Sequence, residues 1–210
     1  MSSAASIKQV KKQLRKQLKE KLKSISQESL TRQSHLIHQN LLAHPNFKDA
    51  QSIAVYMNMP DLEVQTMEII KSCFTLGKNV YLPRCNYTQV PGRKLNYMSM
   101  IRMPTFQSVL DLTPQGKYQL LEPTQGEDVM DTGNLDLIIV PGVAFDRAKN
   151  RMGHGAGFYD EFITTYTSKH TTRPYLLALA LDEQLTDHIP TEPHDWRLDS
   201  IVTSSSSSSL

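Results

Sequence analysis

The chain has 210 residues, of which 39% are hydrophobic and 21% are charged, a composition typical of a globular protein with one sizeable core. Its mean hydropathy of −0.39 and the absence of any apolar run near the roughly 20 residues of a transmembrane helix exclude a helical membrane protein. The two cysteines, Cys73 and Cys85, have no metal-binding spacing and are too few for a disulfide framework, which favours structural thiols in a reducing compartment.

Positive charge is concentrated near the beginning of the chain. Residues 1–32 contain nine Lys or Arg and two acids, whereas the remainder contains fourteen bases and nineteen acids. Such a basic segment is typical of nucleic-acid binding, of a membrane surface, of a mitochondrial presequence or of phosphate binding. Composition alone does not choose among these.

Helices and strands are predicted to alternate along the chain. Apolar residues three and four apart predict helices over 7–25, 30–41, 64–76 and 159–166. Short apolar runs predict strands over 53–57, 80–82, 95–100, 135–140, 176–181 and 201–203. Strands separated by helices indicate an α/β protein with a mainly parallel open sheet. We predict a single domain over 1–203 and a Ser-rich tail over 204–210, and expect long connections and a β excursion within 83–134.

The densest chemical signal is the segment 146–160, DRAKNRMGHGAGFYD, which follows the predicted buried strand ending at Val140. Gly153, Gly155 and Gly157 let the backbone approach a ligand closely and turn its N–H groups towards an anion. The predicted helix that follows presents its N-terminus to the same point. The segment therefore predicts a phosphate site.

Three charged side chains in this segment fit such a site. Lys149 and Arg151 are cationic donors, and Asp160 could hold magnesium among phosphate oxygens. The segment lacks the GxxxxGK[ST] of a P-loop, and its third glycine comes one residue early for GxGxxG. A tight strand-to-helix turn without a ligand is therefore the alternative interpretation.

Other candidates have ordinary alternatives. Lys11 and Arg15 share one helix face, where they could hold phosphates or form a solvated basic stripe. Glu63 follows a strand, as ligand-contacting residues of open sheets do, but it could also be a surface acid or a charge at a helix N-terminus. Asp195 could approach a metal or be a turn or cap residue, and His154 could touch a ligand or be an exposed loop residue.

Together these residues resemble the 5-formyltetrahydrofolate cyclo-ligases, also called 5,10-methenyltetrahydrofolate synthetases. The matching segments run through nearly the whole chain, and the longest has an order of features that is specific to this family. They are KKQLR at 11–15, EVQT at 63–66, LPR at 82–84, LDLIIVPGVAFD at 135–146, NRMGHGAGFYD at 150–160 and HD at 194–195.

The resemblance implies a three-layer α/β/α sandwich and an ATP-dependent ring closure. In this reaction 5-formyltetrahydrofolate becomes 5,10-methenyltetrahydrofolate, with release of ADP and phosphate. The formyl oxygen takes the γ-phosphoryl group of ATP, N10 attacks the activated carbon, and phosphate leaves. The implied partners are the two small-molecule substrates and Mg²⁺. We also predict that the protein binds no nucleic acid and no membrane, and that it is a monomer.

Residue roles follow by resemblance, position by position. The implied ATP-binding residues are Lys11, Lys12, Gln13, Leu14, Arg15, Arg151, Met152, Gly153, His154, Gly155, Ala156, Gly157, Phe158 and Tyr159. The implied folate-binding residues are Met57, Glu63, His154, Gly155, Ala156, Gly157 and Phe158. Arg151, His154 and Tyr159 are the implied catalytic residues, and Asp160 and Asp195 the implied magnesium ligands.

The chain departs from the family pattern at two positions. Many relatives have Lys or Gly in place of Ala156 and Tyr in place of Phe158, so a cation and a hydroxyl are missing here. Two other functions are alternatives. One is a nucleic-acid-binding module that uses the basic helix, and the other is an enzyme or sensor that binds a sugar phosphate or a coenzyme A ester. We predict a cytoplasmic protein, with a mitochondrial one as the alternative because the first 24 residues are basic and nearly free of acids.

Overall fold

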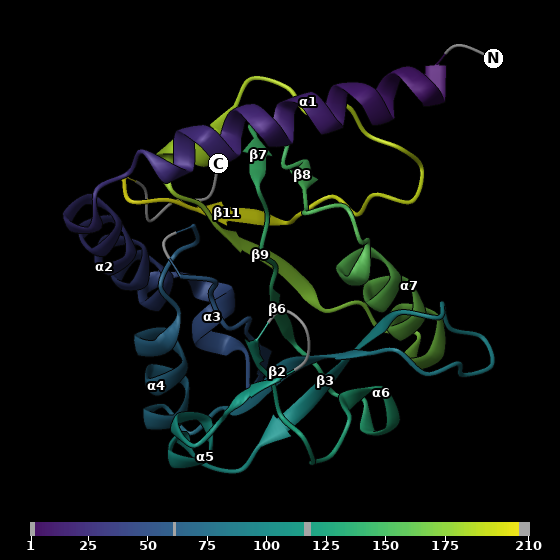
Figure 1. Cartoon of the computed structure of the whole chain (residues 1–210). Coiled ribbons are helices and arrows are strands. Elements are labelled where there is room, and N and C mark those ends of the chain that lie inside the picture. Colours follow the sequence, from purple (N-terminus) through teal and green to yellow (C-terminus); the bar gives the residue numbers. More distant parts are fainter. Residues whose placement is uncertain (1–2, 61, 116–118, 206–210) are drawn as a thin grey trace.

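A six-stranded sheet forms the centre of the protein (Figure 1). The computed structural model describes residues 3–60, 62–115 and 119–205. The strand order is β11-β9-β6-β1-β2-β3. These strands are β1 (Ser52–Ala54), β2 (Asn79–Asn86), β3 (Tyr97–Met103), β6 (Leu137–Ile139), β9 (Tyr175–Leu179) and β11 (Ser200–Val202). Neighbours are parallel except for the antiparallel pair β2 and β3, which confirms the mainly parallel sheet.

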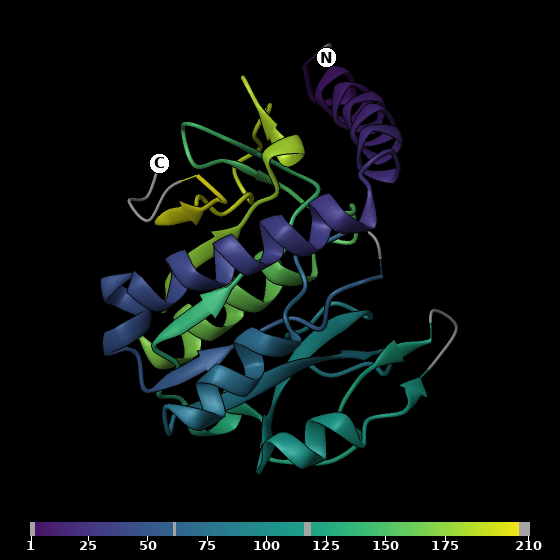
Figure 2. The same ribbon diagram turned by 90° about the vertical axis from the view of Figure 1, so that its left-hand side faces the viewer.

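Helices cover both faces of this sheet (Figures 1 and 2). On one face, an apolar core joins the sheet to α2 (Gln27–Ala43), α3 (Pro45–Asp49), α4 (Met67–Thr75) and α5 (Phe106–Leu110). On the other face, a second core joins it to α6 (Val129–Thr132) and α7 (Phe158–His170). The strands are buried on both sides, as their continuous apolar runs predict. The fold is the implied three-layer α/β/α sandwich.

The helix boundaries follow from local sequence signals. The Ser26 side chain caps α2 by accepting a hydrogen bond from the backbone N–H of Ser29 at 3.1 Å. This helix ends before Pro45, because a residue preceding proline disfavours helical backbone angles. Gly77, with φ of +71°, follows the end of α4 and lets the chain turn back into β2.

The direction in which successive strands are added to the sheet reverses between β1 and β6, and this positions the ligand site. The chain passes from β1 through α4 to β2 on one side, and from β6 through α7 to β9 on the other. Right-handed crossovers in opposite directions put α4 and α7 on opposite faces. Open α/β sheets bind ligands at such a switch point, outside the carboxyl ends of the strands.

The helix α1 (Ser3–Lys23) lies across the top of the molecule in Figure 1, over a small three-stranded sheet. That sheet contains β10 (Leu185–Thr186), β7 (Ala144–Asp146) and β8 (Arg151–Met152), and β10 follows the short 3₁₀ helix η1 (Asp182–Gln184). Leu14 and Leu18 of α1 pack against apolar residues of β7 and β8. The buried Asp146 carboxylate closes the β7–β8 turn by accepting hydrogen bonds from Asn150. The small sheet thereby attaches the basic helix to the segment that carries the glycines.

The predicted elements are all present, with boundaries shifted by a few residues. The main strand β1 ends at Ala54, earlier than predicted, although the Val55 N–H still donates to the Tyr81 carbonyl at 2.9 Å. The region 83–134 contains the β excursion, in which β2 and β3 pair over seven residue positions, and a two-stranded sheet of β4 (Pro114–Gln115) and β5 (Leu120–Leu121). In the predicted tail, 206–210 lie outside the described residues. Within the described ranges, no helix combines the length and apolar character needed to cross a bilayer.

Candidate functional site

A pocket of about 490 Å³ lies at the carboxyl ends of β1, β2 and β6. This volume is in the range of small-molecule sites. Its wall is formed by residues after β1, by Pro141 after β6, by the 151–160 segment, by one face of α1 and by the 192–195 loop. The sequence-predicted residues that line it are Lys11, Arg15, Met57, Glu63, Arg151, Met152, Gly153, His154, Gly155, Ala156, Gly157, Phe158, Tyr159, Asp160 and Asp195.

Three residues of the predicted ATP site do not line this pocket. Lys12 is exposed, and Gln13 and Leu14 face a shallower depression beside His188 and Pro190. The reason is helical geometry: successive residues of an α-helix point about 100° apart, so a run of five cannot face one site. Only Lys11 and Arg15 of this run are on the pocket side.

The glycine segment forms the floor between β8 and α7. Gly155 has φ of +109° and Gly157 has φ of +71°, values that L side chains rarely adopt. Gly157 is the N-cap of α7 and provides no side-chain cap, so the N-terminal end of this helix stays available to a ligand. An anion above the segment would meet backbone N–H groups and the positive end of the helix dipole.

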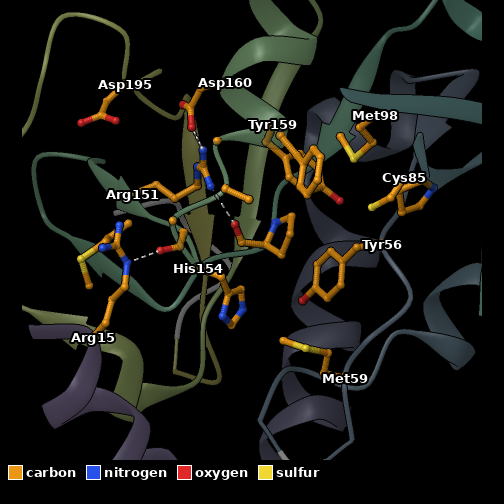
Figure 3. A pocket seen from close by; sticks show the side chains of 18 of the residues that line it. Arg15, Tyr56, Met59, Cys85, Met98, Arg151, His154, Tyr159, Asp160 and Asp195 are labelled. Atoms are coloured by element: carbon orange, nitrogen blue, oxygen red, sulfur yellow. Dashed lines mark hydrogen bonds and ion pairs between the residues drawn. The ribbon is translucent and has the colours of Figure 1, made fainter. Parts of the chain in front are cut away.

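Arg15 of α1 and Arg151 of β8 lie at one end of the pocket (Figure 3), and Lys11 of α1 also lines the pocket. Arg15 Nε donates to the Gly153 carbonyl at 2.8 Å, and a Cβ on Gly155 would lie 3.6 Å from the Arg15 guanidinium carbon. Arg151 is buried in the wall and donates to an Asp160 carboxylate oxygen at 2.6 Å. Lys11 Nζ donates to Glu192 at 2.9 Å and to Asp195 at 2.6 Å.

Lys11 and Arg15 both remain charged at neutral pH. Burial lowers the pKa of Lys11, but its hydrogen bonds to Asp195 and Glu192 outweigh burial and leave the pKa above its ordinary value. Burial lowers the pKa of Arg15, which starts so high that the guanidinium stays protonated at neutral pH. This end of the pocket suits a polyanion.

Carboxylates at the same end are suitable metal ligands. One ligand atom from each of Glu192, His194 and Asp195 lies within 4.8 Å of the others. Burial raises the pKa of Asp195, but hydrogen bonds from Lys11 and from the Glu192 backbone outweigh this and leave it below its usual value. Mg²⁺ prefers one or two carboxylate oxygens together with phosphate oxygens. Glu192 and Asp195 supply such carboxylates, and Lys11 Nζ donates to one oxygen of each. Asp160 differs, because its two oxygens accept from Arg151 and from the Trp196 backbone N–H.

The opposite end of the pocket is apolar with one buried acid. Tyr56, Met59, Cys85 and Met98 lie together there, beside Tyr159 at the start of α7 (Figure 3). This set has sulfur and aromatic surface suitable for a flat ring system.

Glu63 is the buried acid of this end. One of its oxygens accepts from the Met59 backbone N–H at 2.7 Å, and the other lies 3.5 Å from His154 Nε2. Burial, and then the Glu63 charge, raise the pKa of both Tyr56 and Tyr159, so both hydroxyls stay protonated at neutral pH. Glu63 and the two tyrosines thus offer both hydrogen-bond acceptors and donors, and His154 lies between the two ends of the pocket (Figure 3).

Several lining residues were not predicted from the sequence. Tyr56 immediately precedes the predicted Met57, and Glu192 and His194 lie three residues and one residue before the predicted Asp195, so proximity to a candidate was the available signal. Cys85 and Met98 belong to β2 and β3, whose pairing brings them to the pocket. They lie in the stretch with the weakest sequence pattern.

Nearly the whole chain is similar to one family of known proteins. A sequence model of the 5-formyltetrahydrofolate cyclo-ligase family matches residues 7–204. The chain belongs to this family. It is 33% identical over 203 residues to 5-formyltetrahydrofolate cyclo-ligase of Mus musculus, covering 95% of this chain and 96% of the mouse protein. It is 40% identical over 187 residues to 5-formyltetrahydrofolate cyclo-ligase of Saccharomyces cerevisiae, covering 85% of this chain and 88% of that one.

Solved structures of the family have the same fold. The NMR structure of Aquifex aeolicus 5,10-methenyltetrahydrofolate synthetase superposes with a TM-score of 0.73 at 27% identity, covering 94% of this chain and 91% of the other. Cyclo-ligase family membership therefore agrees with both the sequence and the architecture, as the motif resemblance predicts.

Proposed function

We propose that this protein is an ATP-dependent 5-formyltetrahydrofolate cyclo-ligase that forms 5,10-methenyltetrahydrofolate, ADP and phosphate. The observation that carries the proposal is the polarity of one pocket. Lys11, Arg15 and Arg151 gather at one end, and Tyr56 and the buried Glu63 lie at the other. Family membership supports the same substrates.

The chemistry explains why the two ends meet at a glycine segment. The formyl oxygen attacks the γ-phosphorus of ATP and ADP leaves. N10 then attacks the formyl carbon and gives up its proton, and the phosphorylated oxygen leaves as phosphate. Both transfers need close approach and charge stabilisation more than covalent assistance. Gly153, Gly155 and Gly157 permit the approach, because no side chain projects from them between the ligands.

Individual residues then have the following roles. Arg15 and Lys11 bind ATP phosphates, and Arg151 stabilises charge on the transferring group. Glu63 accepts hydrogen bonds from the N–H groups of the pterin, and Met57 and Phe158 contact its ring. His154 lies close enough to Glu63 to be oriented by it, at 3.5 Å, while remaining exposed to the pocket.

Mg²⁺ is the proposed cofactor of the enzyme, and it would bind together with ATP. Asp195 and Glu192 would hold it, whereas the two oxygens of Asp160 accept from Arg151 and from the Trp196 N–H. When bound, Mg²⁺ neutralises negative charge on the phosphate oxygens. Cytoplasmic residence and a monomeric state remain predictions from the sequence.

The test is the near-ultraviolet absorbance of the methenyl product when purified protein meets 5-formyltetrahydrofolate and Mg-ATP. We expect a rise that requires ATP. Arg15→Ala should raise the KM for ATP by about tenfold or more and leave the KM for folate unchanged, whereas Glu63→Gln should do the reverse. Lys19→Ala, an exposed change elsewhere on α1, is the matched control. Folded protein that binds ATP without forming product would contradict the proposal and favour a sugar phosphate or acyl ester as substrate.

A further inference from the structure

The connection between β2 and β3 brings one more cation to the glycine segment. This connection, residues 87–96, runs beside α7 (Figure 1). Within it, Lys94 Nζ would lie 3.7 Å from a Cβ placed on Gly157. Because Gly157 lines the pocket and begins α7, the Lys94 ammonium lies at the edge of the predicted phosphate site.

A buried ion pair fixes the connection in this place. Arg93 Nε and Nη2 donate to the two carboxylate oxygens of Glu161 at 2.6 and 2.9 Å. Both side chains are less than a tenth exposed, and Arg93 Nη2 also donates to the Met98 carbonyl at 2.9 Å. The Arg93 guanidinium lies 4.4 Å from the ring centre of Tyr97. Bidentate Arg–carboxylate pairs are among the most geometrically specific contacts in proteins.

The same ion pair connects Lys94 to the first turn of α7. Glu161 belongs to this turn, and its backbone N–H donates to the Gly157 carbonyl at 3.1 Å. The ion pair with Glu161 therefore holds Arg93 one helical turn from Gly157. Lys94 follows Arg93 in the sequence, and its ammonium group lies beside Gly157. The position of Lys94 is a consequence of this attachment.

The charge of Lys94 is uncommitted. Lys11, Arg15 and Arg151 each donate to carboxylate or carbonyl oxygens of the protein. Lys94 is exposed, and in the part of the chain that the structure describes it makes no hydrogen bond or ion pair. A phosphate that binds Lys94 therefore does not compete with a protein acceptor, whereas one that binds Lys11 must compete with Glu192 and Asp195.

We propose that Lys94 is a further nucleotide-binding residue, which pairs with a phosphate group of ATP above Gly157, and that the Arg93–Glu161 ion pair positions it. This inference rests on the proposed function, since it places ATP at the glycine segment. It adds a further cation to the four that line the pocket, which are Lys8, Lys11, Arg15 and Arg151, and this cation comes from the β2–β3 connection. The neighbouring Ala156 supplies no charge, and Lys94 Nζ lies 3.7 Å from a Cβ placed on Gly157, the N-cap of α7.

The test measures binding by calorimetry, so that it does not depend on turnover. Lys94→Met should weaken ATP binding by about five- to tenfold, as expected for loss of one partly exposed charge pair, and leave binding of adenosine and of 5-formyltetrahydrofolate unchanged. Lys94→Arg should restore most of the affinity. Lys48→Met is the matched control, because Lys48 is an exposed lysine on α3, away from the pocket.

A second variant tests the positioning role. Glu161→Gln should weaken ATP binding by a similar factor, and its combination with Lys94→Met should weaken it no further, because both changes remove one interaction. If it unfolds the protein, Arg93→Lys tests the same ion pair with the charge retained. ATP binding by Lys94→Met equal to that of the wild type would overturn the inference, as would weakening that extends equally to adenosine.

The two proposals fail differently. Wild-type protein that binds ATP but forms no methenyl product contradicts the proposed function, while the Lys94 comparison still reports on phosphate binding. Product formation together with unaltered ATP binding in Lys94→Met contradicts the inference alone. Wild-type protein that binds no ATP contradicts both.

Discussion

Replacing Lys11 with methionine measures how much the ion pairs of this residue contribute to stability. Its ammonium group joins α1 to the 192–195 loop through Glu192 and Asp195, and the Lys11 side chain is 7% exposed. Methionine keeps most of the apolar stem and removes only the charge. The substitution therefore tests the ion pairs rather than the packing.

The expected loss is about 2 kcal/mol in the free energy of unfolding. Hydrogen bonds to charged groups contribute about 1.5–3 kcal/mol each when buried, and exposed ion pairs about 0–1 kcal/mol. The Glu192 and Asp195 side chains are 28% and 15% exposed, so the pair lies between these limits. Removing the cation also leaves two carboxylates with oxygens within 4.8 Å of each other, which adds repulsion.

Urea unfolding, followed by the fluorescence of the single tryptophan, Trp196, measures this loss. Lys12→Met is the matched control: Lys12 is exposed one residue away, and its replacement should change stability by less than about 0.5 kcal/mol. A Lys11→Met loss no larger than the control would refute the reasoning. A double-mutant cycle with Glu192→Gln should show a coupling energy of about 0.5 kcal/mol or more.

The pH dependence gives an independent check. The Asp195 pKa is lowered on folding, so its contribution is present above an ordinary carboxyl pKa and is lost as the pH falls through the lower folded value. The Lys11 pKa is raised, so its contribution is present below the unfolded value and is lost as the pH rises through the folded one. The stability difference between wild type and Lys11→Met should therefore be largest between about pH 4 and 10 and shrink outside that window.

Three further changes probe the loop, the core and the thiols. Gly155→Ala forces a side chain onto a φ of +109° and should weaken ATP binding and lower stability by about 1–3 kcal/mol, measured by calorimetry and urea unfolding. Tyr166→Phe removes the hydroxyl that accepts from the buried Leu135 N–H at 2.8 Å and should cost about 1–3 kcal/mol. Burial raises the pKa of Cys73 and of Cys85 to about 12, so both thiols should react with a disulfide reagent at pH 8 far more slowly than in urea.

Each of these has a contrasting outcome. Gly77→Ala also places a side chain at positive φ, but away from the pocket, and should lower stability without changing ATP binding. Equal loss of ATP affinity in both glycine variants would mean that the effect is global. Wild-type stability in Tyr166→Phe would show that water or another group takes over from the hydroxyl. Rapid reaction of the native thiols would show that their surroundings open to solvent.

The glycine segment could be predicted as a site because its signals are local. Gly153, Gly155 and Gly157 stand beside Arg151 in the sequence, and a buried strand precedes them, so spacing alone indicates a backbone turned towards an anion. The alternation of apolar runs likewise predicts the sheet and its two layers of helices. These patterns depend on neighbours a few residues apart.

The remainder depends on contacts that no local pattern specifies. Lys11 meets Asp195 across 184 residues, and neither residue carries a signal that names the other. Cys85 and Met98 reach the pocket only because β2 and β3 pair in one particular register. The motif 11–15 could be matched to the family as a run of residues, but only the helix geometry separates the two that face the pocket from the three that do not.

The Lys11 contacts span 181 and 184 residues, which makes them among the longest loop closures in the chain. The ends of such a loop meet only after the intervening chain is ordered, because closure entropy grows with loop length. During synthesis, α1 emerges well before the 192–195 loop. A nascent chain therefore cannot complete its cation and carboxylate cluster until residue 195 has been made, and a product truncated before residue 192 should retain most of the sheet yet bind nucleotide weakly.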